Sequence, residues 1–190
     1  GSDIDSTDLT YTVTGGSDNT VTAELDGTSV VFVAAADYNG SETFIATVTD
    51  GEYSASQSFT VTVNAVNDEP TANATSGTVA EDGSVVITLT GDDIDGDNLS
   101  FDLDTNATNG SVTVDGSFAT YTPNANYSGD DSFTFAVSDG DLSSSATVTL
   151  TVNAVNDAPT LAAVDAVSFD EDGSTSTTLS GSDIDSSGLT

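Results

Sequence analysis

The sequence predicts an all-β chain of tandem Greek-key β-sandwich repeats, each of about 90 residues and of immunoglobulin-like type. Three observations favour this fold: segments recur at a constant spacing, apolar residues alternate with small polar ones, and no segment has a helical period. The segment GSDIDSTDLT at residues 1–10 returns as GDDIDGDNLS at 91–100 and as GSDIDSSGLT at 181–190. VTVNAVNDEP at 61–70 likewise returns as LTVNAVNDAP at 150–159.

This spacing predicts one complete repeat between two partial ones. Residues 1–66 correspond to the last two-thirds of a repeat, 67–156 to a complete repeat, and 157–190 to the first third of another. Two arrangements stay open. The chain is an excerpt from a longer array, or separate chains complete each other's partial repeats and form a filament.

Within the complete repeat, the hydrophobic period is two. Apolar residues alternate with Ser, Thr, Asp or Ala along 99–103, 133–137 and 146–152. Such alternation is typical of antiparallel strands that are buried on one face. About seven short strands in such a repeat predict a β-sandwich, in which Thr suits the outward positions.

Turn residues separate these strands. Asp115-Gly116 lies between two alternating runs and predicts a β-hairpin. The first repeat has Glu24–Gly27 at the matching place, where we expect a longer, inserted version of the hairpin. Pro70, Pro123 and Pro159 all fall at junctions or turns, as expected for a residue that cannot donate to a strand ladder.

The composition is strongly acidic, with no basic side chain to balance the acids. The 190 residues include 32 Asp plus Glu, no Lys, Arg, His or Cys, and the formal net charge is −32. Nucleic-acid binding and attraction to anionic lipid both need Lys or Arg, and nucleophilic catalysis through His, Cys or Lys is excluded. No apolar run approaches the ~20 residues of a membrane span, so no membrane insertion is expected here. The absence of Cys fits an extracellular bacterial protein.

The acids avoid the strands and gather in loops that recur with the repeat. The clusters are Asp92, Asp93, Asp95 and Asp97; Glu81 and Asp82; Asp130 and Asp131; Asp139 and Asp141; and the junction residues Asn153, Asn156 and Asp157, which repeat Asn64, Asn67 and Asp68. Carboxylates this close repel each other, and the chain has no cation to neutralise them. Calcium takes six to eight oxygen ligands in irregular geometry, so the clusters predict Ca²⁺ sites.

Three other interpretations of the clusters compete with calcium. Asp, Asn and Gly are ordinary turn residues, and an acidic surface also serves solubility or salt tolerance. An EF-hand-like loop at Asp93–Asp97 fails because its Gly comes fourth rather than sixth. The periodic return of the acids at repeat junctions favours calcium over these interpretations.

In order, the segments VAEDGS, DDID, SFTFAVSDG, SSSATVTLTV and NAVNDAP resemble a cadherin repeat, and most closely the bacterial cadherin-like repeats of giant RTX-type adhesins. The resemblance extends over the whole chain in register. It implies that calcium binds between successive repeats, which lie head to tail.

The resemblance also implies the ligands at each junction. At the first junction they are Glu42, Asn64, Asn67, Asp68, Asp93, Asp95 and Asp139. At the second junction they are Glu81, Asp130, Asp131, Asn153, Asn156, Asp157, Asp183 and Asp185. Asp3, Asp5 and Asp50 would belong to a junction further upstream. The linker NAVNDAP departs from the animal cadherin pattern, and the acidic pair lacks the usual Arg between its acids.

Three classes of function follow. The first is a calcium-rigidified spacer in a long secreted or cell-surface adhesin, with a self-assembling filament as its variant. The second is a module that binds glycan or a cell surface, which the aromatic residues support little because most occupy alternating strand positions. The third is a two-carboxylate glycosidase, for which no acid pair is marked as an active site, so we expect no enzyme.

Overall fold

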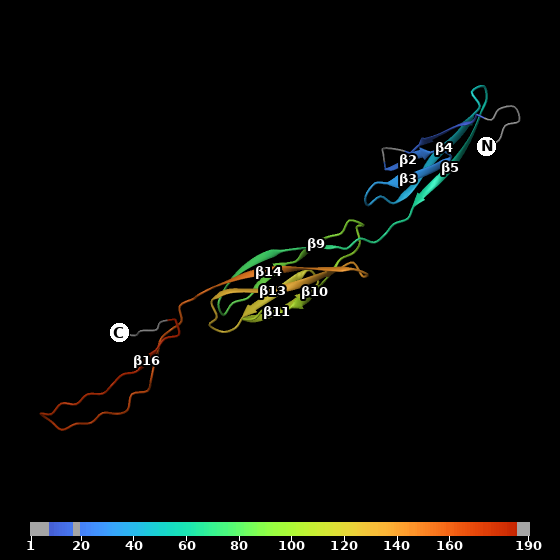
Figure 1. Ribbon diagram of the computed structural model, residues 1–190. Coiled ribbons are helices and arrows are strands. Elements are labelled where there is room, and N and C mark those ends of the chain that lie inside the picture. Colours follow the sequence, from blue (N-terminus) through green and yellow to red (C-terminus); the bar gives the residue numbers. More distant parts are fainter. Residues whose placement is uncertain (1–7, 17–19, 186–190) are drawn as a thin grey trace. The chain divides into compact units, whose positions relative to one another are not determined.

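The computed structural model describes residues 8–16 and 20–185, which form strands, turns and loops with no helix among them (Figure 1). Accordingly, this part of the chain holds no helix long and apolar enough to cross a membrane. The chain divides into two units, Gly1–Asp68 and Glu69–Thr190. The predicted all-β sandwich class is confirmed.

The first unit contains a three-stranded sheet and a hairpin. Its strands are β1 (Thr10–Gly15), β2 (Val21–Asp26), β3 (Ser29–Ala34), β4 (Gly40–Thr49) and β5 (Ser54–Val63). The sheet has the antiparallel order β1-β4-β5, and β2 pairs with β3. Phe32 packs against Phe44 and Phe59 with ring centroids 5.0 and 5.9 Å away. These aromatic contacts join the hairpin to the sheet.

The second unit contains a more complete sandwich. Its strands are β6 (Thr71–Asn73), β7 (Thr75–Ala80), β8 (Val85–Thr88), β9 (Thr90–Asp92), β10 (Ser100–Thr105), β11 (Gly110–Asp115), β12 (Phe118–Pro123), β13 (Gly129–Ser138), β14 (Ser143–Asn153), β15 (Thr160–Leu161) and β16 (Gly181–Ser182). One sheet has the order β10-β13-β14-β7 and the facing sheet has the order β11-β12-β8, while β6 pairs with β9.

β7 and β8 are consecutive in sequence but lie in different sheets. β7 runs parallel to β14, with Val79 opposite Val152, whereas β8 is antiparallel to β12, with Ile87 opposite Ala119. The chain therefore crosses from one sheet to the other at the turn after Ala80. This crossing brings the next residue, an acid, to the end of β14.

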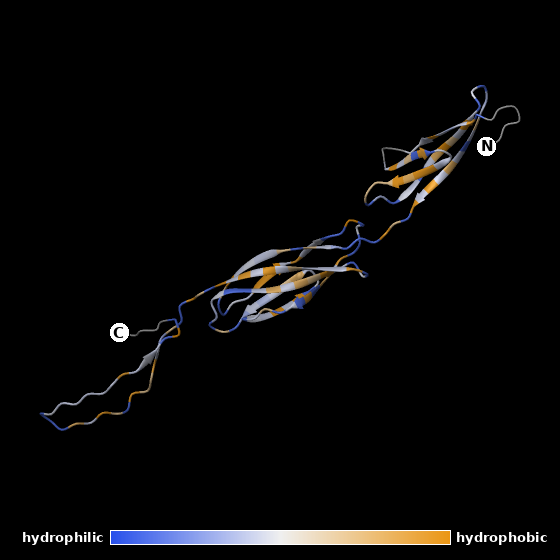
Figure 2. Cartoon of the chain, viewed as in Figure 1, coloured by the Kyte–Doolittle hydropathy of each residue, from blue (hydrophilic) through white to orange (hydrophobic). Residues whose placement is uncertain are grey.

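The core of the second unit follows the predicted alternation. Phe133, Phe135 and Val137 of β13 are at most 1% exposed, and Val148 and Leu150 of β14 are at most 2% exposed. Figure 2 shows the apolar positions concentrated on the strands. Each such side chain contributes about 1.5–3 kcal/mol by leaving water. The period-two prediction is confirmed, since the intervening residues remain on the outer face.

Both repeats contain the same tight hairpin. Asp115 pairs with Phe118 across Gly116, which has a φ of 56°, and Asp26 pairs with Ser29 across Gly27, which has a φ of 62°. Positive φ angles are the conformation in which Gly is favoured over other residues. The predicted Asp-Gly hairpin is confirmed. The prediction of a longer turn in the first repeat is wrong, because the strands pair to the same point in both.

Residues 160–182, hereafter the C-terminal arm, run out and back beyond the complete repeat (Figure 1). β15 and β16 pair at its base, and the N–H of Ala162 donates to the carbonyl of Ser180 at 2.8 Å. Between these points no strand partner flanks the two halves of the arm in the described residues.

Candidate metal centre

Glu81, at the end of the second sandwich, forms hydrogen bonds with the segment that follows β14. Its backbone N–H donates to the carbonyl of Asn153 at 2.9 Å, and its Oε1 accepts from the N–H of Val155 at 2.5 Å. The side chain is 5% exposed. The parallel pairing of β7 with β14 positions this carboxylate against residues 153–159, hereafter the linker.

Asp157 of the linker meets the acids that follow β16. Its backbone N–H donates to Asp185 Oδ2 at 2.5 Å, and the N–H of Asp185 donates to Asp183 Oδ1 at 3.0 Å. Asp157 Oδ2 is buried and accepts no hydrogen bond from the described part of the chain. A carboxylate oxygen out of contact with water and without a donor is unusual and needs a partner.

The electrostatics at Asp157 are those of crowded like charges. Burial raises the pKa of Asp157 above its usual value, and the neighbouring carboxylates of Asp185, Asp82, Glu81 and Asp183 raise it further. The chain contains no Lys, Arg or His to offset this charge. The arrangement therefore favours either a proton or a cation at Asp157.

The donor set fits a hard divalent cation. Every candidate ligand atom is a carboxylate, amide or backbone oxygen, and Asp157 Oδ2 is a buried acceptor with no donor among the described residues. Oxygen ligands from flexible loops suit Ca²⁺, whereas Mg²⁺ demands near-octahedral geometry. We refer to Glu81, Asp82, Asp157, Asp183 and Asp185 as the linker acid group.

Two linker amides were also predicted as ligands. The side-chain amide of Asn156 donates to the carbonyl of Asp157 at 2.9 Å, which supports the turn that carries Asp157. Asn153 accepts the Glu81 N–H through its backbone carbonyl. Both residues thus lie in the linker beside the acids, and their coordination of a metal stays a prediction.

Asp82 belongs to the linker acid group although sequence reasoning left it out of the ligand set. It has a φ of 60°, and its Oδ1 accepts from the N–H of Asn126 at 3.3 Å. The available signal was the Glu-Asp pair itself, which recurs as Glu171-Asp172.

Asp131 lies within the second sandwich, where its carboxylate accepts hydrogen bonds from residues of the same sandwich. Its carboxylate accepts from the N–H groups of Thr108 (3.1 Å), Asn109 (2.9 Å) and Ser132 (2.9 Å) and from the Tyr121 hydroxyl (2.9 Å). Burial tends to raise the pKa of Asp131, but the donated hydrogen bonds outweigh burial and hold it below the usual value. These contacts indicate a structural carboxylate, and its predicted role as a ligand remains untested.

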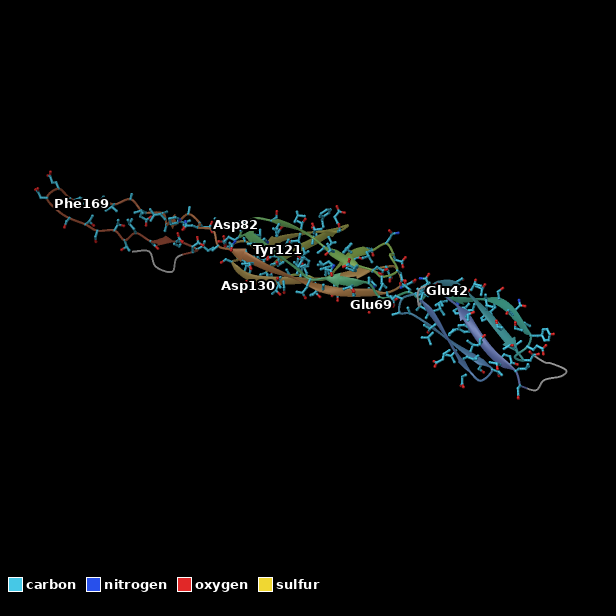
Figure 3. The ribbon with its side chains drawn as sticks, turned by 90° about the horizontal axis from the view of Figure 1, so that it is seen from above. Glu42, Glu69, Asp82, Tyr121, Asp130 and Phe169 are labelled. Atoms are coloured by element: carbon cyan, nitrogen blue, oxygen red, sulfur yellow. The ribbon has the colours of Figure 1, made fainter. Side chains whose placement is uncertain are left out.

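Asp130 points away from this network. Its carboxylate is exposed, while its backbone carbonyl accepts from the Tyr127 hydroxyl at 2.5 Å. Figure 3 labels Asp130 and Tyr121 on the same sandwich. The ligand role of Asp130 also stays a prediction.

A second acid cluster lies in the loop after β9. Single carboxylate oxygens of Asp93, Asp95 and Asp97 all lie within 4.8 Å of one another. The N–H of Asp97 donates to Asp93 Oδ1 at 3.1 Å, while Asp93 Oδ2 is buried without a hydrogen-bond partner in the described residues. Asp93 and Asp95 were predicted ligands from the resemblance, whereas Asp97 was placed in the same acid cluster but not in the ligand set.

Asp139 caps the turn between β13 and β14. Its Oδ1 accepts from the N–H groups of Asp141 and Leu142, both at 2.7 Å. Asp50 does the same in the first unit, where the N–H of Tyr53 and then that of Glu52 lower its pKa. This acid therefore has a turn-forming role in both repeats, beside the metal role predicted for Asp139.

The remaining predicted ligands lie in or next to the first unit. Glu42 is 6% exposed and accepts a hydrogen bond from the Thr20 hydroxyl. The side-chain amide of Asn67 donates to the carbonyl of Asp68 at 3.4 Å, and Asn64 directly follows β5. The predicted meeting of these residues with Asp93 and Asp95 stays a prediction. Asp3 and Asp5 lie outside the described residues.

A comparison with protein families matches residues 67–151 to the family described as "Bacterial Ig domain". The match spans most of the complete repeat. Domains of this class are typically non-enzymatic and typically occur on extracellular or surface proteins. No curated protein matches the chain.

Among solved structures, human protocadherin-24 EC1-2 is similar over 77% of this chain and 82% of that one, with 16% identity and a TM-score of 0.55. At this identity the likeness concerns the fold, which is that of cadherin repeats. The endo-fucoidan hydrolase MfFcnA4 of glycoside hydrolase family 107 is 21% identical over 77% of this chain, with a TM-score of 0.39. This chain spans only 24% of that hydrolase.

Proposed function

We propose that the chain is a calcium-rigidified extender, made of successive repeats of a long extracellular adhesin or surface fibre and joined head to tail with Ca²⁺ at the junctions. The observation that carries this proposal is Asp157 Oδ2, which is buried without a hydrogen-bond partner in the described residues, while the charges of four more carboxylates raise the pKa of this side chain. The proposal gives that oxygen the partner it lacks.

The members of the linker acid group come from three parts of the junction. Glu81 comes from the complete sandwich, Asp157 from the linker, and Asp183 and Asp185 from the start of the following repeat. Bound calcium would supply positive charge shared by these oxygens. The residues themselves position the linker, since the Glu81 carboxylate accepts from the N–H of Val155 and the Asp185 carboxylate accepts from the N–H of Asp157.

The charge of the junction makes its stiffness conditional. Without a cation, the acids of the linker repel those that follow β16, and repulsion favours conformations in which they separate. With the charge neutralised, the same acids draw three segments together. The junction would therefore be flexible at low calcium concentration and stiff at high calcium concentration.

A spacer role also fits a sequence without the His, Cys or Lys that nucleophilic catalysis commonly uses. Ca²⁺ at millimolar concentration is characteristic of the extracellular space, and extracellular modules bind it with dissociation constants of about 10⁻⁴–10⁻³ M. We therefore place the chain outside the cell and assign it no enzymatic activity.

Isothermal titration calorimetry of the full chain tests the assignment. Asp157→Asn and Asp185→Asn remove one charge each from the linker acid group, whereas Asp165→Asn removes one charge from the arm. We expect the parent and Asp165→Asn to bind calcium alike, and both linker variants to lose a site or at least tenfold in its affinity.

Two results contradict the proposal. One is a parent chain that binds no calcium at millimolar concentration. The other is equal binding by Asp157→Asn, Asp185→Asn and Asp165→Asn, which would assign calcium to general negative charge rather than to this group.

A further inference from the structure

The chain contains two Asn-Gly-Ser segments, each at the start of a strand. They are Asn39-Gly40-Ser41, where β4 begins, and Asn109-Gly110-Ser111, where β11 begins. An asparagine before glycine can react with its own backbone, since the glycine has no Cβ to obstruct the approach of its nitrogen to the asparagine side chain. The local sequences are the same, so a difference in reactivity between the two must come from the structure.

The backbone N–H of Gly110 lies on the free edge of β11. The N–H of Asn124 donates to the carbonyl of Asn109 at 2.8 Å, so these two residues form a hydrogen-bonded pair. Hydrogen-bonded and non-hydrogen-bonded pairs alternate along an antiparallel ladder, and the next pair, Gly110 with Pro123, is therefore of the second kind. The Gly110 N–H consequently points away from β12.

A neighbour on the same edge has an acceptor that Gly110 lacks. Val112 also points its N–H away from β12, and it donates to Asn106 Oδ1 at 3.0 Å. No side chain or loop carbonyl of the described residues accepts from the Gly110 N–H. The Gly110 nitrogen can therefore react without first giving up a hydrogen bond to the protein.

The N–H of Gly40 is used by the β4–β5 ladder. The N–H of Asp50 donates to the carbonyl of Tyr53 at 3.3 Å at the turn that joins the two strands. The same alternation, followed along an unbroken register, makes Gly40 and Val63 a hydrogen-bonded pair. Attack by the Gly40 nitrogen first requires that hydrogen bond to break, although the preceding Asn39 is the more exposed of the two asparagines.

The Asn109 side chain is free to move and is open to water. It lies in a bend before β11, is half-buried, and its amide forms no hydrogen bond with the described residues. It lines a hollow of about 630 Å³ whose walls also include Asp130, Ser132, Thr149 and Thr151. A polar hollow of this size admits water, which the hydrolysis of an asparagine consumes.

Packing prevents the fold from avoiding this Asn-Gly pair by replacing the glycine. A Cβ on Gly110 would lie 2.4 Å from Tyr121 Cε2 and 2.6 Å from the carbonyl oxygen of Thr122. The Tyr121 ring is fully buried in the core and cannot give way. Glycine is therefore required directly after Asn109.

We propose that Asn109 is a site of spontaneous covalent modification, at which the folded chain converts this asparagine to aspartate and isoaspartate. The Gly110 nitrogen loses its proton to base and attacks Cγ of Asn109. The N–Cγ bond forms, the Cγ–Nδ2 bond breaks, and Nδ2 takes up a proton and leaves as ammonia. Water then opens the five-membered imide. Cleavage of the N–Cγ bond gives aspartate, and cleavage between the nitrogen and the Asn109 carbonyl carbon gives isoaspartate.

Both products disturb the hydrogen bonds around Asp131. The Asn109 N–H donates to Asp131 Oδ2 at 2.9 Å, and the same oxygen accepts from the Tyr121 hydroxyl. Either product adds a negative charge to the hollow that Asp130 and Asp131 already line, in a chain without a basic side chain. Isoaspartate also lengthens the backbone by a methylene and misaligns the N–H and carbonyl groups of this residue. The second unit should therefore lose stability as the chain ages.

Peptide mapping of the full chain tests the site. Ser128→Asn adds a matched Asn-Gly pair in the same unit, because Gly129 and Val152 form a hydrogen-bonded pair by the alternation from Asp139. In warm, mildly alkaline buffer with EGTA, we expect Asn109 to convert at least about fivefold faster than the amide introduced by Ser128→Asn, the factor that a net ladder hydrogen bond is worth. In urea, where no ladder remains, the two should convert at similar rates.

Urea denaturation of aged samples tests the consequence. Asn109→Gln keeps the amide but places it one methylene further away, so the five-membered ring cannot form. The urea midpoint of the parent should fall with the extent of conversion, whereas that of Asn109→Gln should stay constant.

Three results overturn the proposal: Asn109 that stays intact in the folded chain while it converts in urea, conversion no faster than at the Ser128→Asn site, or an equal fall of the midpoint in the parent and in Asn109→Gln. These measurements are made in EGTA and follow a covalent change in one residue. They are therefore independent of the calcium binding on which the spacer function rests.

Discussion

The two repeats of the chain hold an acid at the same strand position, buried as Glu42 and half-buried as Asp131, but give it different hydrogen-bond donors. Asp131 of the second unit accepts from the Tyr121 hydroxyl at 2.9 Å. In the first unit the matching residues are Glu42 and Phe32, and Phe32 has no hydroxyl to donate. Glu42 is one methylene longer and accepts from the Thr20 hydroxyl. In both repeats the carboxylate at this position accepts a hydrogen bond from a hydroxyl. The longer acid, Glu42, occurs with Phe32, and the shorter acid, Asp131, occurs with Tyr121.

This comparison separates two kinds of acid in the chain. The prediction that the acids avoid the strands is wrong for Glu42 and Asp131, which lie in β4 and β13. These strand acids have donors within their own repeats. The acids of the linker group lie outside the strands, and the other members of the group raise the pKa of Asp157. Strand acids should stabilise the fold with or without calcium, whereas Asp157, which has a buried carboxylate oxygen without a donor in the described residues, should stabilise the junction only when a cation is bound.

The largest effect should follow removal of the strand acid of the second unit. Asp131→Ala leaves the Tyr121 hydroxyl and the N–H groups of Thr108 and Asn109 without their acceptor, at a cost of about 3 kcal/mol in the free energy of unfolding. Urea denaturation in EGTA measures it. Asp130→Ala, one residue away and exposed, should change stability by less than about 0.5 kcal/mol. Equal effects of the two substitutions would show that Asp131 has no special structural role.

Calcium should have the next largest effect. A site filled at about 100 times its dissociation constant adds about 2.7 kcal/mol, because only the folded state binds. That gain raises the Tm of a domain this size by about 10 °C or more. Differential scanning calorimetry in EGTA and in millimolar calcium measures the shift, with Asp157→Asn as the variant that should lose it. Identical melting in both buffers contradicts the distinction between strand acids and linker acids.

A smaller effect should follow loss of the Tyr121 hydroxyl. Tyr121→Phe makes the second unit resemble the first at this position but leaves the shorter Asp131 with one donor fewer. A hydrogen bond to a charged group is worth about 1.5–3 kcal/mol, so we expect the free energy of unfolding to fall by about 1.5 kcal/mol. Tyr127→Phe removes a hydroxyl that donates to a neutral backbone carbonyl and should cost less. A greater loss for Tyr127→Phe in urea denaturation would reverse this ranking.

The smallest effect concerns pH, and its sign differs between the two kinds of acid. Asp131 has a folded pKa below the ordinary 3.8, so its stabilisation is present above that value and is lost as the pH falls through the folded pKa. Asp157 has a pKa above 3.8, so without calcium the folded junction loses stability as the pH rises through that pKa.

Asp157→Asn should therefore lessen the loss of stability on raising the pH in EGTA. Urea midpoints of the parent and the variant between about pH 4 and pH 7 measure this difference. Parallel curves would mean that the pKa of Asp157 does not differ between the folded and unfolded states.

Much of the fold was predictable because it depends on local pattern. The alternation at Phe133, Phe135 and Val137 reports a buried face directly, and the Asp115-Gly116 turn requires the positive φ that Gly adopts. The error at Glu24–Gly27 arose from placing a length difference at a turn tip, although the two hairpins pair identically.

The acid clusters were less predictable, because spacing does not reveal donors from other strands. Asp131 meets Tyr121 and the N–H groups of Thr108 and Asn109 only after β11, β12 and β13 assemble. The approach of Asp82 to Asp157 likewise depends on the parallel pairing of β7 with β14. Sequence periodicity could mark these acids as recurrent but could not separate structural acids from linker acids.

The central claim, that calcium stiffens the junction at Asp157, is tested most directly by the spread of distances across it. Spin labels at Thr147→Cys in β14 and Ser176→Cys in the arm report that distance by pulsed electron resonance, with labelled chains diluted in unlabelled ones. We expect a broad distribution in EGTA and a narrow one in calcium, and a broad one in both for Asp157→Asn. Equal widths for the parent in EGTA and in saturating calcium would contradict the account.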